Sequence, residues 1–281
     1  MSLLDPECPA IAKAFLRRTP RRPPEARGGG KDPVFRRAGS SFDLKCIREY
    51  CPSDDPRRID WKLLGRCGRP YVKEFLEEDR DGVCVLVDRS ASIGSFGAEE
   101  AARVAASIAW LLGAIGLPTS LWAFSDRPVR RLERPRGGGS AAPVLSFFSG
   151  LGISGRTDIS ACLAAARASS RARRAVLVSD FLDPRFDPRA SPFARSFYVR
   201  LRGDFEALAA GLSELRVVDP ESGRSLLLPW DALARESYRA RDRELSAALG
   251  EAARRGSWSG TVESGADRAS LYWELLEAIY A

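Results

Sequence analysis

The sequence of 281 residues contains no histidine. Histidine is the usual general acid or base near neutral pH, and it is also the commonest protein ligand of zinc. Its absence therefore excludes histidine-containing catalytic triads and histidine-ligated zinc sites. Any chemistry must depend on carboxylates, hydroxyls, thiols, amines or a metal ion that prefers oxygen ligands.

Paired cysteine motifs and long apolar runs are also missing. None of the six cysteines forms a C-x-x-C pair, and the spacing of Cys46, Cys51 and Cys67 matches no common zinc motif. The uncharged stretch 104–125 is interrupted at residues 116–120, whereas a membrane-spanning helix needs about 20 consecutive apolar residues. With no secretory signal either, we expect a cytoplasmic protein with reduced thiols and no membrane contact.

The net charge of +7 is unevenly distributed. Residues 1–40 contain nine lysines and arginines against four acidic residues, so most of the excess lies there. Residues 17–31 are rich in Arg, Pro and Gly and cannot form a core, so we expect residues 1–40 to be a basic, partly disordered arm. A solvated tail is the simpler interpretation, and an arm that binds an acidic partner or RNA through residues 17–37 is the alternative. The nearly neutral remainder argues against a nucleic-acid groove across the body.

Strand and helix signals alternate from about residue 41. The apolar runs 83–87 and 175–179 are typical of strands buried on both faces of a parallel sheet. Further strands are expected at 120–124, 129–132, 197–201, 215–218 and 258–262, and helices at 98–115, 161–168, 231–255 and 267–280. The pattern predicts an α/β fold with a doubly wound, mostly parallel sheet flanked by helices over residues 81–281. Short strands at 41–50 and 71–75 predict a small β-rich extension, residues 41–80, packed on this core.

Oxygen-bearing side chains follow the two buried strands. Asp88, Ser90 and Ser92 come after the first strand, Asp180 comes after the second, and Thr157 precedes a helix between them. Ligands of such sheets bind beyond the carboxyl ends of the strands, and alternate residues of an extended loop point the same way. Hydroxyl and carboxylate oxygens suit Mg²⁺, with Mn²⁺ or Ca²⁺ as alternatives. Taken singly, Thr157 and the following Asp158 are better explained as helix-capping residues than as ligands, and Asp158 is expected to cap the helix at 161–168.

The set Asp88, Ser90, Ser92, Thr157 and Asp180 resembles the metal-ion-dependent adhesion site of von Willebrand factor A domains. The upstream segments 48–50, 54–61 and 72–75 and the segment 217–223 resemble a bacterial branch of such domains, the domain-of-unknown-function family fifty-eight (DUF58). This resemblance implies a binding module and not an enzyme. The metal would capture an acidic side chain of a partner protein. The implied partner is a MoxR-type AAA+ ATPase, which would act with this protein in chaperone-like assembly or maturation of other proteins.

Two residues depart from the family pattern, and several alternatives stay open. Position 89 is Arg and position 93 is Ile, and an Arg there would repel the cation or point away to pair with a partner. The residues of segment 54–61 also fit an ion-pair network with Trp61 filling a core. A metal-dependent phosphohydrolase with Asp88 as nucleophile would need a carboxylate where Ser90 stands. Nucleic-acid binding by the arm is the third alternative.

Overall fold

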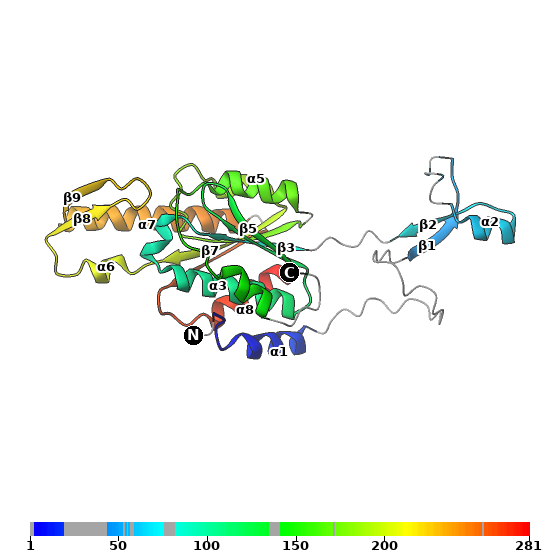
Figure 1. Ribbon diagram of the computed structural model, residues 1–281, viewed down its shortest axis with the longest axis horizontal. Coiled ribbons are helices and arrows are strands. Elements are labelled where there is room, and N and C mark those ends of the chain that lie inside the picture. The colour runs from blue at the N-terminus through cyan, green and yellow to red at the C-terminus, as the bar shows by residue number, and fades with distance from the viewer. Residues whose placement is uncertain are drawn as a thin grey trace. The chain divides into compact units, whose positions relative to one another are not determined.

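The computed structural model describes residues 3–19, 44–52, 54, 56, 59–75, 82–134, 141–170, 172–254 and 256–281. The chain divides into two compact units, one made of residues 1–21 with 81–281 and the other of residues 22–80. Each unit has its own secondary-structure elements (Figure 1).

A six-stranded sheet with the order β10-β7-β6-β3-β4-β5 forms the centre of the larger unit. Its strands are β3 (Val83–Asp88), β4 (Thr119–Phe124), β5 (Pro128–Arg134), β6 (Arg174–Ser179), β7 (Arg195–Arg202) and β10 (Trp258–Glu263). All neighbouring strands are parallel except β4 and β5. The predicted α/β class with a mostly parallel sheet is therefore confirmed.

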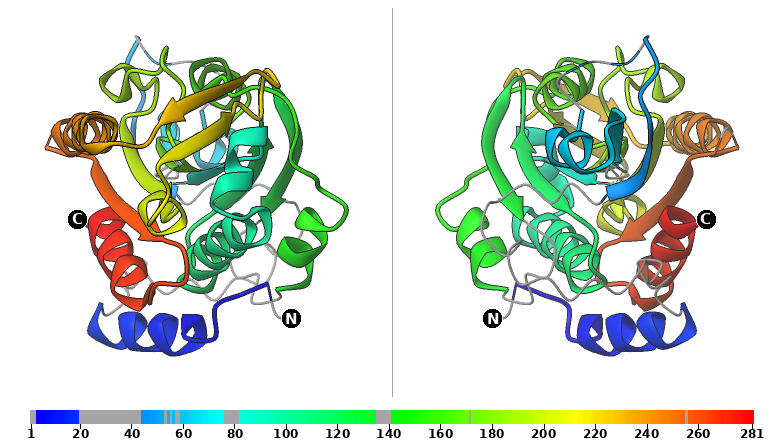
Figure 2. Two further views of the ribbon diagram at one scale, coloured as in Figure 1. Left: turned by 90° about the vertical axis from the view of Figure 1, so that its left-hand side faces the viewer. Right: turned by 90° about the vertical axis from the view of Figure 1, so that its right-hand side faces the viewer.

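Helices cover both faces of this sheet (Figure 2). One face packs against α1 (Cys8–Arg18), α3 (Ala98–Ala114), α4 (Ala142–Phe148) and α8 (Ala269–Tyr280), and the other against α5 (Ile159–Ser169) and α7 (Ala232–Ala253). Each face of the sheet therefore has its own hydrophobic core, and alternate side chains of β3 are buried in one core or the other. Val85 and Val87 lie in the first core, and Cys84 and Leu86 lie in the second. Burial on both faces explains why this strand has an uninterrupted apolar sequence.

Residues 8–18 of the predicted basic, partly disordered arm 1–40 form the ordered helix α1. Cys8, Ile11, Ala12 and Phe15 are buried in the first core. Their spacing of three to four residues places them on one face of the helix. Residues 20–40 of the predicted arm lie outside the described residues.

A hairpin of β8 (Glu214–Val218) and β9 (Ser225–Pro229) stands apart from the sheet and follows the short helix α6 (Phe205–Leu208). In the left view of Figure 2, the yellow and gold hairpin crosses in front of the carboxyl end of the sheet. The sequence predicts β8 but not β9. The two 3₁₀ turns η3 (Ala91–Ser95) and η4 (Pro188–Ala190) complete the larger unit in the described part of the chain.

The smaller unit contains two strands where the sequence predicts them, β1 (Leu44–Glu49) and β2 (Tyr71–Phe75), and they pair in antiparallel fashion. The helix α2 (Trp61–Cys67) lies between the two strands in the sequence. Asp60 caps this helix by accepting the backbone N–H groups of Lys62 and Leu63. Arg48 donates two hydrogen bonds of 2.7 and 2.6 Å to Asp54. The predicted core position of Trp61 is wrong within this unit, where 65% of its surface is exposed. Asp55, Arg57 and Arg58 lie outside the described residues, and packing of the extension on the main domain stays a prediction.

The uncharged stretch 104–125 is divided between α3, a turn and β4, as predicted. Among the described helices, none combines the length and apolar character needed to span a bilayer.

Candidate metal-binding site

Asp88 is the last residue of β3 and lies beside the end of β6, because these two parallel strands are neighbours. Its side chain is completely buried. Asp88 Oδ2 accepts a hydrogen bond of 2.7 Å from the hydroxyl of Ser179, the last residue of β6. Asp88 Oδ1 accepts one of 2.8 Å from the backbone N–H of Ser90. Groups from the two strand ends therefore fix both oxygens of this carboxylate.

The two predicted serines lie in the loop that follows β3. Ser90 precedes the 3₁₀ turn η3 and Ser92 lies in it, so the predicted extended loop is wrong here, but the two hydroxyl oxygens are still 3.1 Å apart. The nearby Ser92 hydroxyl lowers the pKa of Asp180, whereas burial has the larger, opposite effect. Ser92 and Asp180, from two different strand ends, are therefore neighbours.

Asp180 directly follows β6 and is buried. Its Oδ1 accepts a hydrogen bond of 3.1 Å from the backbone N–H of Leu182. Its Oδ2 is buried without a hydrogen-bond partner among the described residues. The next residue, Phe181, has a φ of 58°, a left-handed conformation that is strained for an aromatic residue. Such strain is typical of functional loops and suggests that the position of this loop is under tight constraint.

Backbone hydrogen bonds join the loop that carries Thr157 to the loop after β3. The N–H of Ser154 donates to the carbonyl of Arg89 at 2.9 Å, and the N–H of Ala91 donates to that of Gly155 at 3.1 Å. Thr157 Oγ1 and the Thr157 N–H both donate to Glu221 Oε1, at 2.8 and 3.1 Å. The structure thus brings the predicted Thr157 to the same edge, together with a glutamate that was not predicted there.

Asp158 caps a helix, as predicted. Its Oδ1 accepts a hydrogen bond of 2.9 Å from the N–H of Ala161 and caps the N-terminus of α5. Asp183, which the sequence analysis missed, supports the same end of the helix by accepting the N–H of Ile159 at 3.2 Å. The contact of Asp158 with Ala161 could be predicted from their spacing of three residues. The contact of Asp183 with Ile159 joins two separate loops, so the local sequence gives no sign of it.

The pKa values of Asp88 and Asp180 are raised at this edge. Burial raises the pKa of Asp88 to about 6, and the negative charge of Asp180 adds to this shift. Burial also raises the pKa of Asp180, and the charge of Glu221 adds to it. Each ionised carboxylate therefore makes ionisation of the next one harder, and a cation between them would reverse this effect.

The side chain of Arg89 is buried and binds the chain's own backbone. Its guanidinium donates to the carbonyl oxygens of Ala98 at 2.7 Å and Leu151 at 2.6 Å. Burial lowers the pKa of Arg89, and the charge of Asp88 partly opposes this effect. Because two carbonyls hold the guanidinium, the predicted salt bridge from Arg89 to a partner is not supported.

The residues present fit a hard divalent cation. Two carboxylates and three hydroxyls form a set of oxygen donors, and Asp180 Oδ2 is a buried acceptor that has no hydrogen-bond partner among the described residues. The described residues contain no group of three or more His, Cys, Asp or Glu side chains arranged to hold a metal. The predicted set does not depend on such a group, because only Asp88 and Asp180 among its members belong to these residue types.

A family model described as "Protein of unknown function DUF58" matches residues 46–248. The uncharacterized proteins Mb1516 of Mycobacterium bovis and Rv1480 of Mycobacterium tuberculosis are each 28% identical to this chain over 149 residues, which are 49% of this chain and 46% of theirs. The chain thus spans about half the length of these curated relatives. The crystal structure of the conserved hypothetical protein BatB from Bacteroides thetaiotaomicron matches with a TM-score of 0.43 and 9% identity, over 71% of this chain and 98% of that one. Since the family model covers well over half of the sequence, the chain belongs to the DUF58 family of proteins of unknown function.

Proposed function

We propose that this protein is a metal-dependent protein-interaction module of the von Willebrand factor A type. In this proposal Asp88, Ser90, Ser92, Thr157 and Asp180 hold a divalent cation, preferably Mg²⁺. The proposal rests mainly on one observation: three separate loops bring these residues to one edge of the sheet, where Asp180 Oδ2 is buried with no hydrogen-bond partner in the part of the chain that the structure describes. Such an edge is the usual binding position in open parallel sheets.

Each residue has a distinct part in this proposal. Asp88 and Asp180 supply negative charge, and Ser90, Ser92 and Thr157 supply neutral oxygens, so few negative ligands surround the ion. When bound, the cation supplies a Lewis-acidic position that accepts a carboxylate from a partner protein. The Ser179 hydroxyl and the Ser90 N–H orient Asp88 for this role.

A catalytic role for Asp88 as a nucleophile has less support. Both of its carboxylate oxygens already accept hydrogen bonds, and its side chain is completely buried. A nucleophile must be accessible to the substrate and have a base within reach of the reacting group. The arrangement favours binding over hydrolysis.

The proposed partner is a MoxR-type AAA+ ATPase, and the proposed role is chaperone-like assembly or maturation of other proteins. The proposal of this partner is supported by membership of the DUF58 family, because the resemblance of the sequence to that family implies such an ATPase. The acidic side chain that the metal would capture belongs, in this proposal, to the ATPase or to a protein that it delivers.

An affinity pull-down with isothermal titration calorimetry tests the proposal. Wild type, Asp88→Ala and the control Asp126→Ala are compared in Mg²⁺ and in EDTA. Asp126 is an exposed aspartate in the loop after β4, at the same edge of the sheet but outside the proposed ligand set. We expect Mg²⁺ binding and capture of an AAA+ ATPase by wild type and Asp126→Ala only, and only without EDTA. Equal capture under all conditions would refute the metal dependence.

A further inference from the structure

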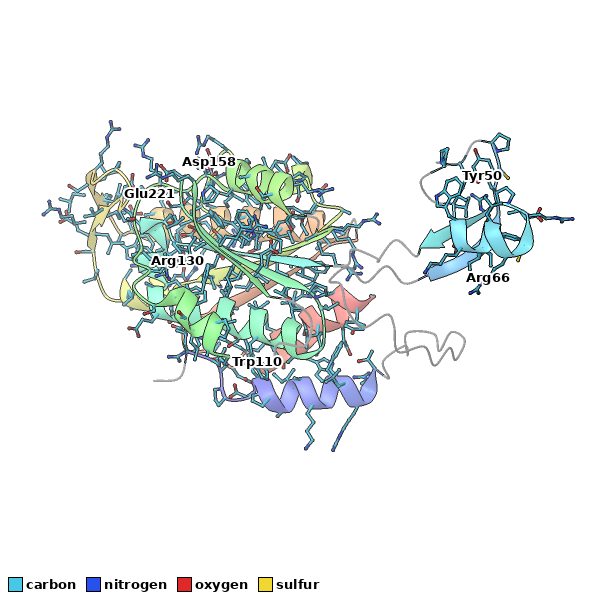
Figure 3. The ribbon with its side chains drawn as sticks, turned by 45° about the vertical axis from the view of Figure 1, so that its right-hand side comes forward. Tyr50, Arg66, Trp110, Arg130, Asp158 and Glu221 are labelled. Carbon is cyan, nitrogen blue, oxygen red and sulfur yellow. The ribbon has the colours of Figure 1, made fainter. Side chains whose placement is uncertain are left out.

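Glu221 reaches the candidate metal site from the turn between β8 and β9. Its carboxylate accepts two hydrogen bonds from Thr157, a residue 64 positions away in the sequence. Its charge also raises the pKa of Asp180 on the other side of the site. Figure 3 labels Glu221 and Asp158, the residue after Thr157, at the same end of the larger unit. A carboxylate of the chain itself therefore lies where the proposed function requires a carboxylate from outside.

The turn does not need Glu221 for its own shape. The Asp219 side chain accepts the N–H of Glu221 at 2.9 Å, and the Asp219 carbonyl accepts the N–H of Gly223 at 2.8 Å. Gly223 has a φ of 69°, which glycine adopts without strain. Because backbone groups and Asp219 make the turn, the side chain of Glu221 is left to bind Thr157.

The hairpin is anchored at its base and exposed along its length. At the base, Trp230 is buried and packs with its ring centroid 5.4 Å from that of Phe205. Along the strands, side chains such as Leu226 and Leu227 have 60% and 62% of their surface exposed. A segment with so little buried surface opens at low free-energy cost, so the contact at its tip can be made and broken.

We propose that Glu221 is an internal ligand of this site, which an acidic side chain of the partner must displace. This inference rests on the proposed function, because it assigns a regulator to the same site. A bound cation would attract Glu221 and strengthen its contact, so the metal-loaded site is closed until a competing carboxylate arrives. If the hairpin is open about a tenth of the time, an external carboxylate binds about tenfold more weakly than to a site without Glu221.

The first test measures hydrogen–deuterium exchange of the metal-free protein by mass spectrometry. Glu221→Ala is compared with wild type and with Glu214→Ala, which removes the same charge from the first residue of β8. We expect faster exchange in the peptide that contains Thr157 and in residues 219–224 for Glu221→Ala alone. Equal exchange in all three proteins would overturn the inference, whatever the metal does.

The second test measures binding of a fluorescein-labelled hexaglutamate peptide in Mg²⁺ by fluorescence anisotropy. We expect Glu221→Ala to bind about tenfold more tightly than wild type and Glu214→Ala, and EDTA to abolish the difference. If calorimetry shows that all three proteins bind Mg²⁺ and their peptide affinities are equal, the internal ligand is refuted and the proposed function stands. If none binds Mg²⁺, the proposed function is itself refuted, and the internal metal ligand with it.

Discussion

Asp5 supplies a buried carboxylate that joins the N-terminal segment to α8, and its removal tests the docking of α1. Its carboxylate accepts hydrogen bonds from Arg268 at 3.2 and 3.3 Å and from the Tyr272 hydroxyl at 2.5 Å. Asp5→Ala would leave these two buried donors without this partner. Removal of one partner of a buried ion pair costs about 3–5 kcal/mol, and we expect about 3 kcal/mol because Arg268 keeps its contact with Glu100.

Urea unfolding followed by circular dichroism and tryptophan fluorescence measures this loss. The matched control is Glu277→Ala, which removes an exposed ion pair between Glu277 of α8 and Arg18 of α1, 3.3 Å apart. Exposed pairs contribute less than about 1 kcal/mol, so the control should shift the midpoint only slightly. The reasoning is refuted if Asp5→Ala destabilises the protein no more than Glu277→Ala while the denaturant slope stays the same.

Packing, thiol burial and the candidate site each give a further expected result. Gly203→Ala would place a Cβ 2.9 Å from the carbonyl oxygen of Ser95, so urea unfolding should show that the free energy of unfolding falls by about 1–3 kcal/mol. The control Gly152→Ala adds a Cβ in open space and should cause no comparable loss of stability. Mass spectrometry after iodoacetamide treatment at pH 8 should find Cys51 and Cys67 modified, because their side chains are exposed. Cys8, Cys84 and Cys162 should stay unmodified, because burial raises the pKa values of their thiols to about 11, 12 and 12. Burial raises the pKa of Asp88 to about 6, so the folded protein loses stability as the pH rises from about 4 through this value and Asp88 ionises. Urea unfolding in EDTA should therefore show the free energy of unfolding of wild type, relative to Asp88→Asn, falling by about 3 kcal/mol over this range. A difference that does not change with pH would contradict the burial of an ionisable Asp88.

The sheet and most of the site could be predicted because local sequence carries their physical cause. A strand that is buried on both faces needs apolar residues throughout, and β3 and β6 show this composition directly. Parallel neighbours end at the same edge, so Asp88 and Asp180 were expected to meet. The N-cap Asp158 also follows from its position three residues before Ala161.

The missed features depend on contacts that local sequence does not contain. The helix α1 has only 11 residues, ends in Arg17 and Arg18, and owes its burial to packing against α3 and α8. The strand β9 carries three consecutive leucines on an exposed hairpin, where neither alternation nor burial marks a strand. The contact from Glu221 to Thr157 depends on where that hairpin lies, and the sequence within the turn gives no sign of it.

The candidate site has features that stability alone does not explain. Burial raises the pKa of both Asp88 and Asp180, and the charge of Asp180 adds to the shift of Asp88. Asp180 Oδ2, which has no hydrogen-bond partner among the described residues, adds a desolvation cost of about 1–3 kcal/mol. Replacing buried charges with apolar residues of similar size is often neutral or stabilising, so a purely structural role does not require these residues. The left-handed Phe181 adds strain at the same loop. Costs of this kind persist at functional sites, where a ligand offsets them. The proposed divalent cation would neutralise Asp88 and Asp180 and would also attract Glu221, whose charge adds to the raised pKa of Asp180.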